Sequence, residues 1–277
     1  MRILVSADME GATGVTWPAD VEPGNAQWER LRGLLTGDVN AAVAGLCAGG
    51  ADEVLVNDAH STMRNLLLER LDPRASVLTG RHKTLSMVEG IQDREVAGVV
   101  FLGYHVGAGA DGVLAHTYLP NSITEVRVDG ALAGEGRLNA LVAEEFGVPV
   151  ILVTGDDATC VDARDYAPTA RSAAVKDHVS RYAAVCRPPE VTAALIEERA
   201  KEAVALAGRR PHPEPCPHTV QVEVDAAHLA EAATLIPGVE RIGVRRVQYA
   251  SRSAYEMIRC FKALTVVVSA AVEALYG

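Results

Sequence analysis

Two carboxylates close the first apolar run of the chain, and their spacing could bind a metal ion. The run Arg2-Ile-Leu-Val-Ser predicts a short buried strand, which ends on Asp8 and Glu10 and is followed at once by Gly11. Side chains alternate along a strand, so residues two apart point to the same side if the strand continues. Two neighbouring carboxylates with no Lys or Arg beside them repel each other, and a metal ion commonly compensates that charge.

Other predicted elements also lead into side chains of the kinds that bind zinc. A strand predicted at 53–57 leads to His60, and a strand predicted at 97–103 leads to His105. Glu135 begins the helix that follows a predicted hairpin. In α/β proteins the carboxyl ends of parallel strands form the crevice that binds ligands. Imidazole and carboxylate together suit zinc, and five such residues exceed the usual three of one catalytic zinc, which favours a two-metal site.

The same residues have an ordinary structural interpretation, and the spacing alone leaves it open. An Asp at a strand end commonly caps a helix or closes a turn. A His after a strand commonly forms a hydrogen bond within a loop. His116 lies in a glycine-rich loop eleven residues beyond His105. It is either a loop residue near the site by chance, or a proton donor or oxyanion stabiliser for a tetrahedral intermediate.

Apolar strands and helical patterns alternate through the part of the chain that must position these residues. Helices are expected over residues 25–48, 63–71 and 135–146. Strands that are apolar throughout, alternating with helices, predict a parallel sheet buried on both faces. The fold class expected is therefore α/β, with three layers and a mostly parallel central sheet.

The last third of the chain has a different pattern and predicts a smaller α+β portion. A linker with four prolines spans 211–217, and the last helix is expected over 254–276. We therefore expect two domains. Residues 1–187 would form an α/β metal-binding catalytic domain, and residues 188–277 a smaller α+β C-terminal domain or appendage.

Composition argues against several classes of partner. The 277 residues carry a formal net charge of -10, and aromatic residues make up only 4%. Both features disfavour nucleic acid, which attracts basic proteins and stacks on aromatic side chains. No apolar stretch reaches about 18 residues and the N-terminus lacks a signal-peptide pattern, so we expect no membrane partner and a cytoplasmic location. The five scattered cysteines form no C-x-x-C pair, which predicts free thiols.

Several motifs occur in order along the chain and together resemble a known family. They are Ser6-Ala-Asp-Met-Glu-Gly11, Val56-Asn-Asp-Ala-His-Ser61, Ser86-Met-Val-Glu-Gly90, Phe101-Leu-Gly-Tyr-His105, and Gly134-Glu135 with Leu138-Asn-Ala140. The series is similar to that of the zinc-dependent D-aminopeptidases, peptidase family M55. The similarity runs nearly from end to end, and several motifs in register are far more specific than any single one.

The resemblance implies a metallo-aminopeptidase that hydrolyses short peptides with an N-terminal D-amino acid, such as D-Ala-D-Ala, with two zinc ions. It implies self-association as well, into a ring-shaped decamer whose active sites face an inner chamber. The family's functional residues fall on Asp8 as bridging ligand, on the further ligands Glu10, His60, His105 and Glu135, and on the catalytic His116.

One departure from the family pattern stands next to an implied ligand. The family pattern is Gly-Glu-Leu-Gly-Leu-Asn-Ala, whereas this chain has Gly134-Glu-Gly-Arg-Leu-Asn-Ala140. Arg137 could therefore change the charge or the access near the site. Two alternative functions stay open on the sequence: a metal-dependent hydrolase of another small amide, and a non-catalytic peptide-binding protein linked to peptide transport.

Overall fold

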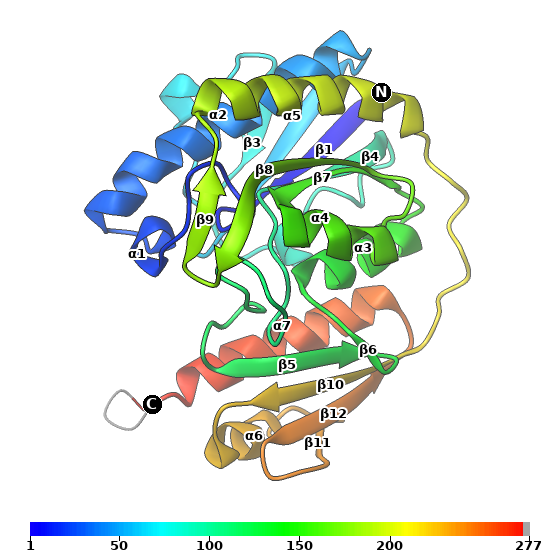
Figure 1. Ribbon diagram of the computed structural model, residues 1–277. Helices are drawn as coiled ribbons and strands as arrows, with labels where there is room; N and C mark the ends of the chain where they lie inside the picture. Colours follow the sequence, from blue (N-terminus) through cyan, green and yellow to red (C-terminus); the bar gives the residue numbers. More distant parts are fainter. Residues whose placement is uncertain (274–277) are drawn as a thin grey trace.

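The computed structural model describes residues 1–273, which form two sheets with helices packed around them (Figure 1). The strands of the first sheet are β1 (Arg2–Ala7), β2 (Glu53–Asp58), β3 (Ala75–Leu78), β4 (Val96–Leu102), β7 (Val150–Asp156), β8 (Arg171–Ser180) and β9 (Ala183–Cys186). Their order is β3-β2-β1-β4-β7-β8-β9, and neighbours are parallel except for β8 and β9. The predicted α/β fold with a mostly parallel central sheet is confirmed.

Helices cover both faces of this sheet and complete three layers. One face packs against α2 (Ala26–Ala48) and α5 (Pro189–Ala203), and the other against α3 (Glu135–Glu145) and α4 (Asp157–Tyr166). The central strands β1, β4 and β7 are buried almost throughout. Because neither face meets water, these strands are apolar at nearly every position instead of alternating. The remaining helices beside this sheet are short: α1 (Pro18–Val21) and the 3-10 turns Leu68–Arg70, Ser86–Val88 and Val204–Leu206.

The second sheet is antiparallel and lies below the first in Figure 1. Its strands are β5 (Ile123–Val128), β6 (Ala131–Leu132), β10 (His218–Val224), β11 (Glu240–Arg241) and β12 (Arg246–Ser251), and its helices are α6 (Ala227–Ala233) and α7 (Ala254–Ala270). The order is β11-β12-β10-β5-β6. Helix α7 contacts α3 on one side and β10 and β12 on the other, so it joins the two sheets.

The division into domains at residue 188 stays a prediction, and the sheets divide the chain at other points. The predicted hairpin of β5 and β6 precedes residue 188, yet it pairs with β10 in the second sheet. Its turn residues Asp129 and Gly130 both have positive φ, 53° and 84°, as a tight two-residue hairpin requires. Helix α5 follows residue 188, yet it packs on α2 in the first layer. The chain thus crosses between the two parts more than once.

The helix predicted over 63–71 is wrong. That segment is irregular apart from one 3-10 turn, because the carboxylate of Asp58 accepts hydrogen bonds from the backbone N–H groups of Asn65 and Leu66, at 2.5 and 2.9 Å. Trp28 also donates its indole N–H to the Asn65 side chain, at 3.0 Å. These tertiary contacts outweigh the helix propensity of the segment.

The last helix ends at Ala270, and the expected continuation to Tyr276 reaches residues 274–277, which lie outside the described part. Helix α4 and strands β8 and β9 had not been predicted. Within residues 1–273, no helix is both long enough and apolar enough to cross a membrane.

Candidate metal centre

The residues predicted as metal ligands meet at the carboxyl edge of the parallel sheet. Strand pairing sets Ala7 beside Asp58 of β2 and beside Leu102 of β4, so the ends of β1, β2 and β4 lie next to one another. The loops that leave these ends carry the predicted ligands of the first motifs, and the first turn of α3 carries the last of them. All are buried: Asp8, Glu10, His60, His105 and Glu135.

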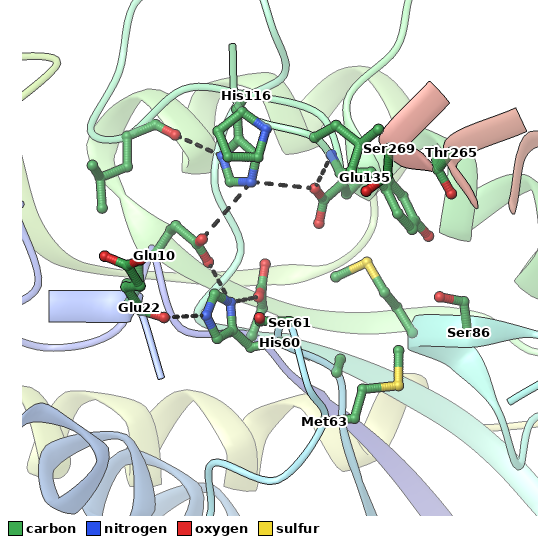
Figure 2. Close-up of a pocket in the computed structure, with 18 of the residues that line it drawn as sticks. Glu10, Glu22, His60, Ser61, Met63, Ser86, His116, Glu135, Thr265 and Ser269 are labelled. Atoms are coloured by element: carbon green, nitrogen blue, oxygen red, sulfur yellow. Dashed lines mark hydrogen bonds and ion pairs between the residues drawn. The ribbon is translucent and has the colours of Figure 1, made fainter. Parts of the chain in front are cut away.

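Asp8 lies between two histidines, with one oxygen facing each. His60 Nδ1 lies 3.3 Å from Asp8 Oδ1, and His105 Nε2 lies 3.5 Å from Asp8 Oδ2. Glu10 Oε2 lies 3.0 Å from His60 Nδ1 (Figure 2). Glu135 Oε2 lies 3.6 Å from His105 Nε2. The five side chains therefore form one continuous cluster of nitrogen and oxygen donors.

Backbone carbonyls fix the orientation of the three imidazoles. Each ring has one nitrogen within hydrogen-bond distance of a carbonyl oxygen, at 2.7 to 2.9 Å: His60 Nε2 with Val21, His105 Nδ1 with Val106, and His116 Nδ1 with Leu114. A carbonyl only accepts, so the nitrogen that faces it carries the proton. In a neutral ring the other nitrogen is then a bare acceptor turned toward the carboxylates. Metal-binding histidines are commonly fixed by such a donated hydrogen bond.

Three buried atoms in the cluster have no hydrogen-bond partner in the described residues: Asp8 Oδ2, Glu10 Oε2 and His105 Nε2. The first and the last of them face each other, 3.5 Å apart. Two triplets also offer ligand atoms within 4.8 Å of one another, His105 with His116 and Glu135, and Asp8 with Glu10 and His105. Unpaired buried polar atoms are costly, and a cation between them would remove that cost. The donors thus fit zinc, which binds imidazole and carboxylate.

The pKa values show how strongly these groups perturb one another in the absence of a metal. Burial and the charge of Glu10 raise the pKa of Asp8 to about 7. Burial also disfavours the ionised form of Glu10, but the attraction of His60 outweighs it and holds the pKa of Glu10 well below its usual value. Burial lowers the pKa of His105, but Glu135 outweighs that effect and raises it to about 10. The raised pKa values of Asp8 and His105 mean that bound protons balance part of the carboxylate charge, which a bound metal ion would balance instead.

His116 completes the cluster from the glycine-rich loop. Its ring stacks on that of His105, with centroids 4.2 Å apart and planes 5° from parallel. Its Nε2 lies 3.8 Å both from Glu10 Oε1 and from Glu135 Oε1. Burial and the neighbouring His105 lower the pKa of His116, which keeps this ring neutral near pH 7. A neutral imidazole that faces the cluster can accept a proton or bind a metal.

A cavity of about 620 Å³ opens onto the cluster, and its lining concentrates backbone strain. In the described residues, seven non-glycine residues have positive φ, and all but Asp129 line this cavity. Such conformations cost free energy and gather at functional sites. No local sequence pattern predicted them: Ser61, Met63, Ser86, Leu114, Tyr118 and Asn121.

Two buried lysines, which the sequence analysis did not single out, hold the loops of the site. Lys176 is fully buried, and its ammonium donates to the carbonyl oxygens of Glu10, Ala12 and Val15 at 2.7, 3.0 and 2.6 Å. Lys83 fastens the end of β2 in the same way, through the Asn57 side chain and the carbonyls of Asp58 and Leu78. A lysine directly after the apolar run Ala173-Ala-Val175 was the available signal for Lys176.

The departure from the family pattern next to Glu135 has a structural explanation. A Cβ on Gly136 would lie 2.3 Å from the hydroxyl of Tyr166, so this tyrosine fills the space that a larger side chain would need. Arg137 forms an ion pair with Asp165 and does not line the cavity. Its charge is therefore directed toward α4, away from the predicted ligands.

A buried cluster of carboxylates and imidazoles, placed at the carboxyl edge of a parallel sheet and open to a cavity, is typical of a metal-dependent hydrolase. Comparison with known proteins is more specific. Residues 1–263 match the Peptidase M55 family, described as D-aminopeptidase. The chain therefore belongs to the D-aminopeptidase family M55, as the resemblance predicted, and is a peptidase.

Two relatives show how far the similarity extends. A D-aminopeptidase of Bacillus subtilis (strain 168) is 35% identical over 275 residues, which cover 98% of each chain. A solved structure, described as the Zn-dependent D-aminopeptidase DppA from Bacillus subtilis, a self-compartmentalizing protease, has a TM-score of 0.91 at 33% identity. That match covers 97% of this chain and 98% of the other.

Proposed function

We propose that this protein is a zinc-dependent D-aminopeptidase that uses two zinc ions to hydrolyse short peptides with an N-terminal D-amino acid, of the D-Ala-D-Ala type. The observation that carries the proposal is the meeting of five buried donors in one cluster, four of which line the same cavity: Asp8, Glu10, His60 and Glu135. The described activity of the Bacillus subtilis relatives supports the substrate class.

The ligands in this proposal are Asp8, Glu10, His60, His105 and Glu135. Asp8 is the bridging ligand, because its two oxygens face different histidines, at 3.3 and 3.5 Å. Zinc bound to such a site lowers the pKa of a water molecule and polarises the scissile carbonyl. The hydrogen bond from the backbone N–H of Tyr118 to Glu135 Oε1, at 2.7 Å, orients that carboxylate toward His105.

His116 is the proton-transfer residue of the proposed mechanism. Its Nδ1–H is held by the carbonyl of Leu114, so Nε2 is the atom that takes and gives the proton. Because its pKa is lowered, the ring is neutral at the start and can accept a proton. The proton it would accept is the one that the attacking water gives up; in its charged form the ring would stabilise the oxyanion, and it would then pass the proton to the leaving amine.

We also propose that the protein forms a homo-oligomer, specifically a ring-shaped decamer. The support is the description of the structural relative as self-compartmentalizing. Exposed apolar side chains on the β8–β9 hairpin, Val179, Tyr182 and Val185, offer surface for such contacts. Ten copies of 29.3 kDa would give about 293 kDa. Light scattering after size exclusion tests this, and a mass near 29.3 kDa would contradict it.

The first experiment compares D-Ala-D-Ala with L-Ala-L-Ala, with and without a chelator, by measuring released alanine. Cleavage of the D-peptide alone, abolished by the chelator, is the expected result. Cleavage of the L-peptide, or of neither peptide by zinc-loaded protein, would redirect the search to other small amides. Protein that binds the peptide but neither binds zinc nor cleaves would support the peptide-binding alternative.

Zinc content separates the proposed roles of the site residues. His116→Ala should lower turnover strongly while two zinc ions remain bound, and loss of zinc would instead make His116 a ligand. Asp8→Ala should remove both ions, and full zinc occupancy in that variant would refute the bridging role. Both variants truncate a buried polar side chain of the same cluster, so each serves as the other's control.

A further inference from the structure

The cavity above the predicted metal site carries charges of both signs. The carboxylates of Asp8, Glu10 and Glu135 are buried at its floor. The more exposed part of its lining holds three cations, Arg81, Arg181 and Lys262, and one carboxylate, Glu22. Although the chain has a net charge of -10, cations therefore outnumber carboxylates in that part of the lining.

Arg81 and Lys262 belong to distant segments that the fold brings together. Lys262, on α7, donates from its ammonium to the backbone carbonyl of Lys83, which places it beside the segment of Arg81. Burial lowers the pKa of Lys262, the charge of Glu89 opposes this shift, and the charge of Arg81 acts in the same direction as burial. Two like charges held close together disfavour each other unless an anion joins them.

Neither cation has an anionic partner within residues 1–273. Arg137 and Arg187, by contrast, pair with Asp165 and Asp177. Arg181 also lines the cavity without an ion pair, but it lies over the ring of Tyr182. Lys83 lines the same cavity, but its ammonium is already committed to three acceptors. Arg81 and Lys262 form no ion pair with any described carboxylate, so their charges are available to a ligand.

We propose that Arg81 and Lys262 form the subsite that binds the C-terminal carboxylate of the peptide substrate. This inference rests on the proposed function. A sphere of 620 Å³ is about 11 Å across, and an extended chain advances about 3.3–3.6 Å per residue, so the cavity accommodates two or three residues. The N-terminal residue lies at the floor, and the free carboxylate reaches the cations. Specificity for short peptides follows, because a longer chain cannot present its carboxylate there.

The test combines a change in the enzyme with a matching change in the substrate. Hydrolysis of D-Ala-D-Ala and of its C-terminal amide is measured for the wild type and for Lys262→Gln and Arg81→Gln, through the release of D-alanine. Hydrogen bonds to charged groups predict that the wild type loses roughly 10- to 100-fold in kcat/KM on the amide. Each variant should reduce the ratio of kcat/KM for D-Ala-D-Ala to kcat/KM for its amide at least threefold. The reason is that the variant raises KM for D-Ala-D-Ala and leaves KM for the amide unchanged.

Arg259→Gln is the control, because Arg259 is an exposed cation on the same helix that does not line the cavity. It should leave the ratio unchanged. If Lys262→Gln fails to fold, the exposed Arg81 still carries the test. Equal kcat/KM on both substrates, or a ratio unchanged in Arg81→Gln, overturns the subsite and leaves the proposed function intact. A zinc-loaded wild type that cleaves neither substrate overturns the proposed function itself.

Discussion

Replacing Gly45 by alanine should destabilise the protein, although alanine is the better helix former. Gly45 lies in the interior of α2, where alanine is favoured over glycine by about 1 kcal/mol. Its Cβ, however, would lie 2.1 Å from the backbone oxygen of Glu197 and 2.8 Å from the Cβ of Ala200. The first of these atoms is backbone, so α2 and α5 must move apart. Overpacking of this kind costs up to about 3 kcal/mol, which leaves a net loss of about 2 kcal/mol.

Gly37→Ala is the matched control in the same helix. No atom lies within 4 Å of a Cβ at Gly37, so helix propensity acts alone and should raise the free energy of unfolding by about 0.5–1 kcal/mol. Urea unfolding followed by circular dichroism, at one protein concentration and one zinc concentration, gives both differences. The same substitution should therefore lower the free energy of unfolding at Gly45 and raise it at Gly37. A Gly45→Ala protein as stable as Gly37→Ala would refute the argument that close helix packing requires Gly45.

Three further predictions concern the site and its supports. Lys176→Met leaves the buried carbonyls of Glu10 and Val15 without a donor, at about 1–3 kcal/mol each, while that of Ala12 keeps the N–H of Val15. Both stability and zinc content should therefore fall, whereas Lys201→Met on the exposed surface of α5 should change neither. Burial raises the pKa of Asp38 to about 6. Between pH 4 and 6 the Asp38 carboxyl then binds more proton in the folded state than in the unfolded state. Its contribution to the free energy of unfolding should therefore fall by up to roughly 3 kcal/mol as the pH rises through this range. Urea titrations at several pH values should show a flatter pH dependence for Asp38→Asn. Removing zinc with a chelator should lower the melting temperature measured by scanning fluorimetry. Free zinc at a thousandfold excess over its Kd should restore about 4 kcal/mol of the free energy of unfolding. A melting temperature that does not change would contradict zinc binding to the folded state.

The convergence of the predicted ligands could be foreseen because it follows from a rule of the fold. Apolar runs that alternate with helices predict a parallel sheet, and the carboxyl ends of its strands meet at one edge. Asp8, His60 and His105 each follow such a run closely, so their proximity could be expected, although the spacing alone left their role as ligands open. Glu135 is not covered by this rule, because it begins α3 after a hairpin that belongs to the second sheet.

The wrong helix prediction and the unpredicted positive φ values share a cause: contacts with distant parts of the chain determine the local structure. Residues 63–71 have good helix formers, yet Asp58 and Trp28 fix Asn65 in an irregular conformation. The positive φ of Met63 and Tyr118 likewise has no signal in these residue types, which ordinarily avoid that region. Propensity describes a segment by itself, and these segments are held by other parts of the chain.

The support of the site is invisible in the sequence for a second reason, which is that it consists largely of backbone. All three imidazoles face carbonyl oxygens, and Lys176 binds three more. A carbonyl is present whatever the side chain, so Val21, Val106 and Leu114 can be substituted without removing the acceptor. The histidines and the lysine have no such freedom, because the donor is the side chain itself. Substituting Val106 by another aliphatic residue should therefore leave His105 oriented, whereas moving its backbone would not.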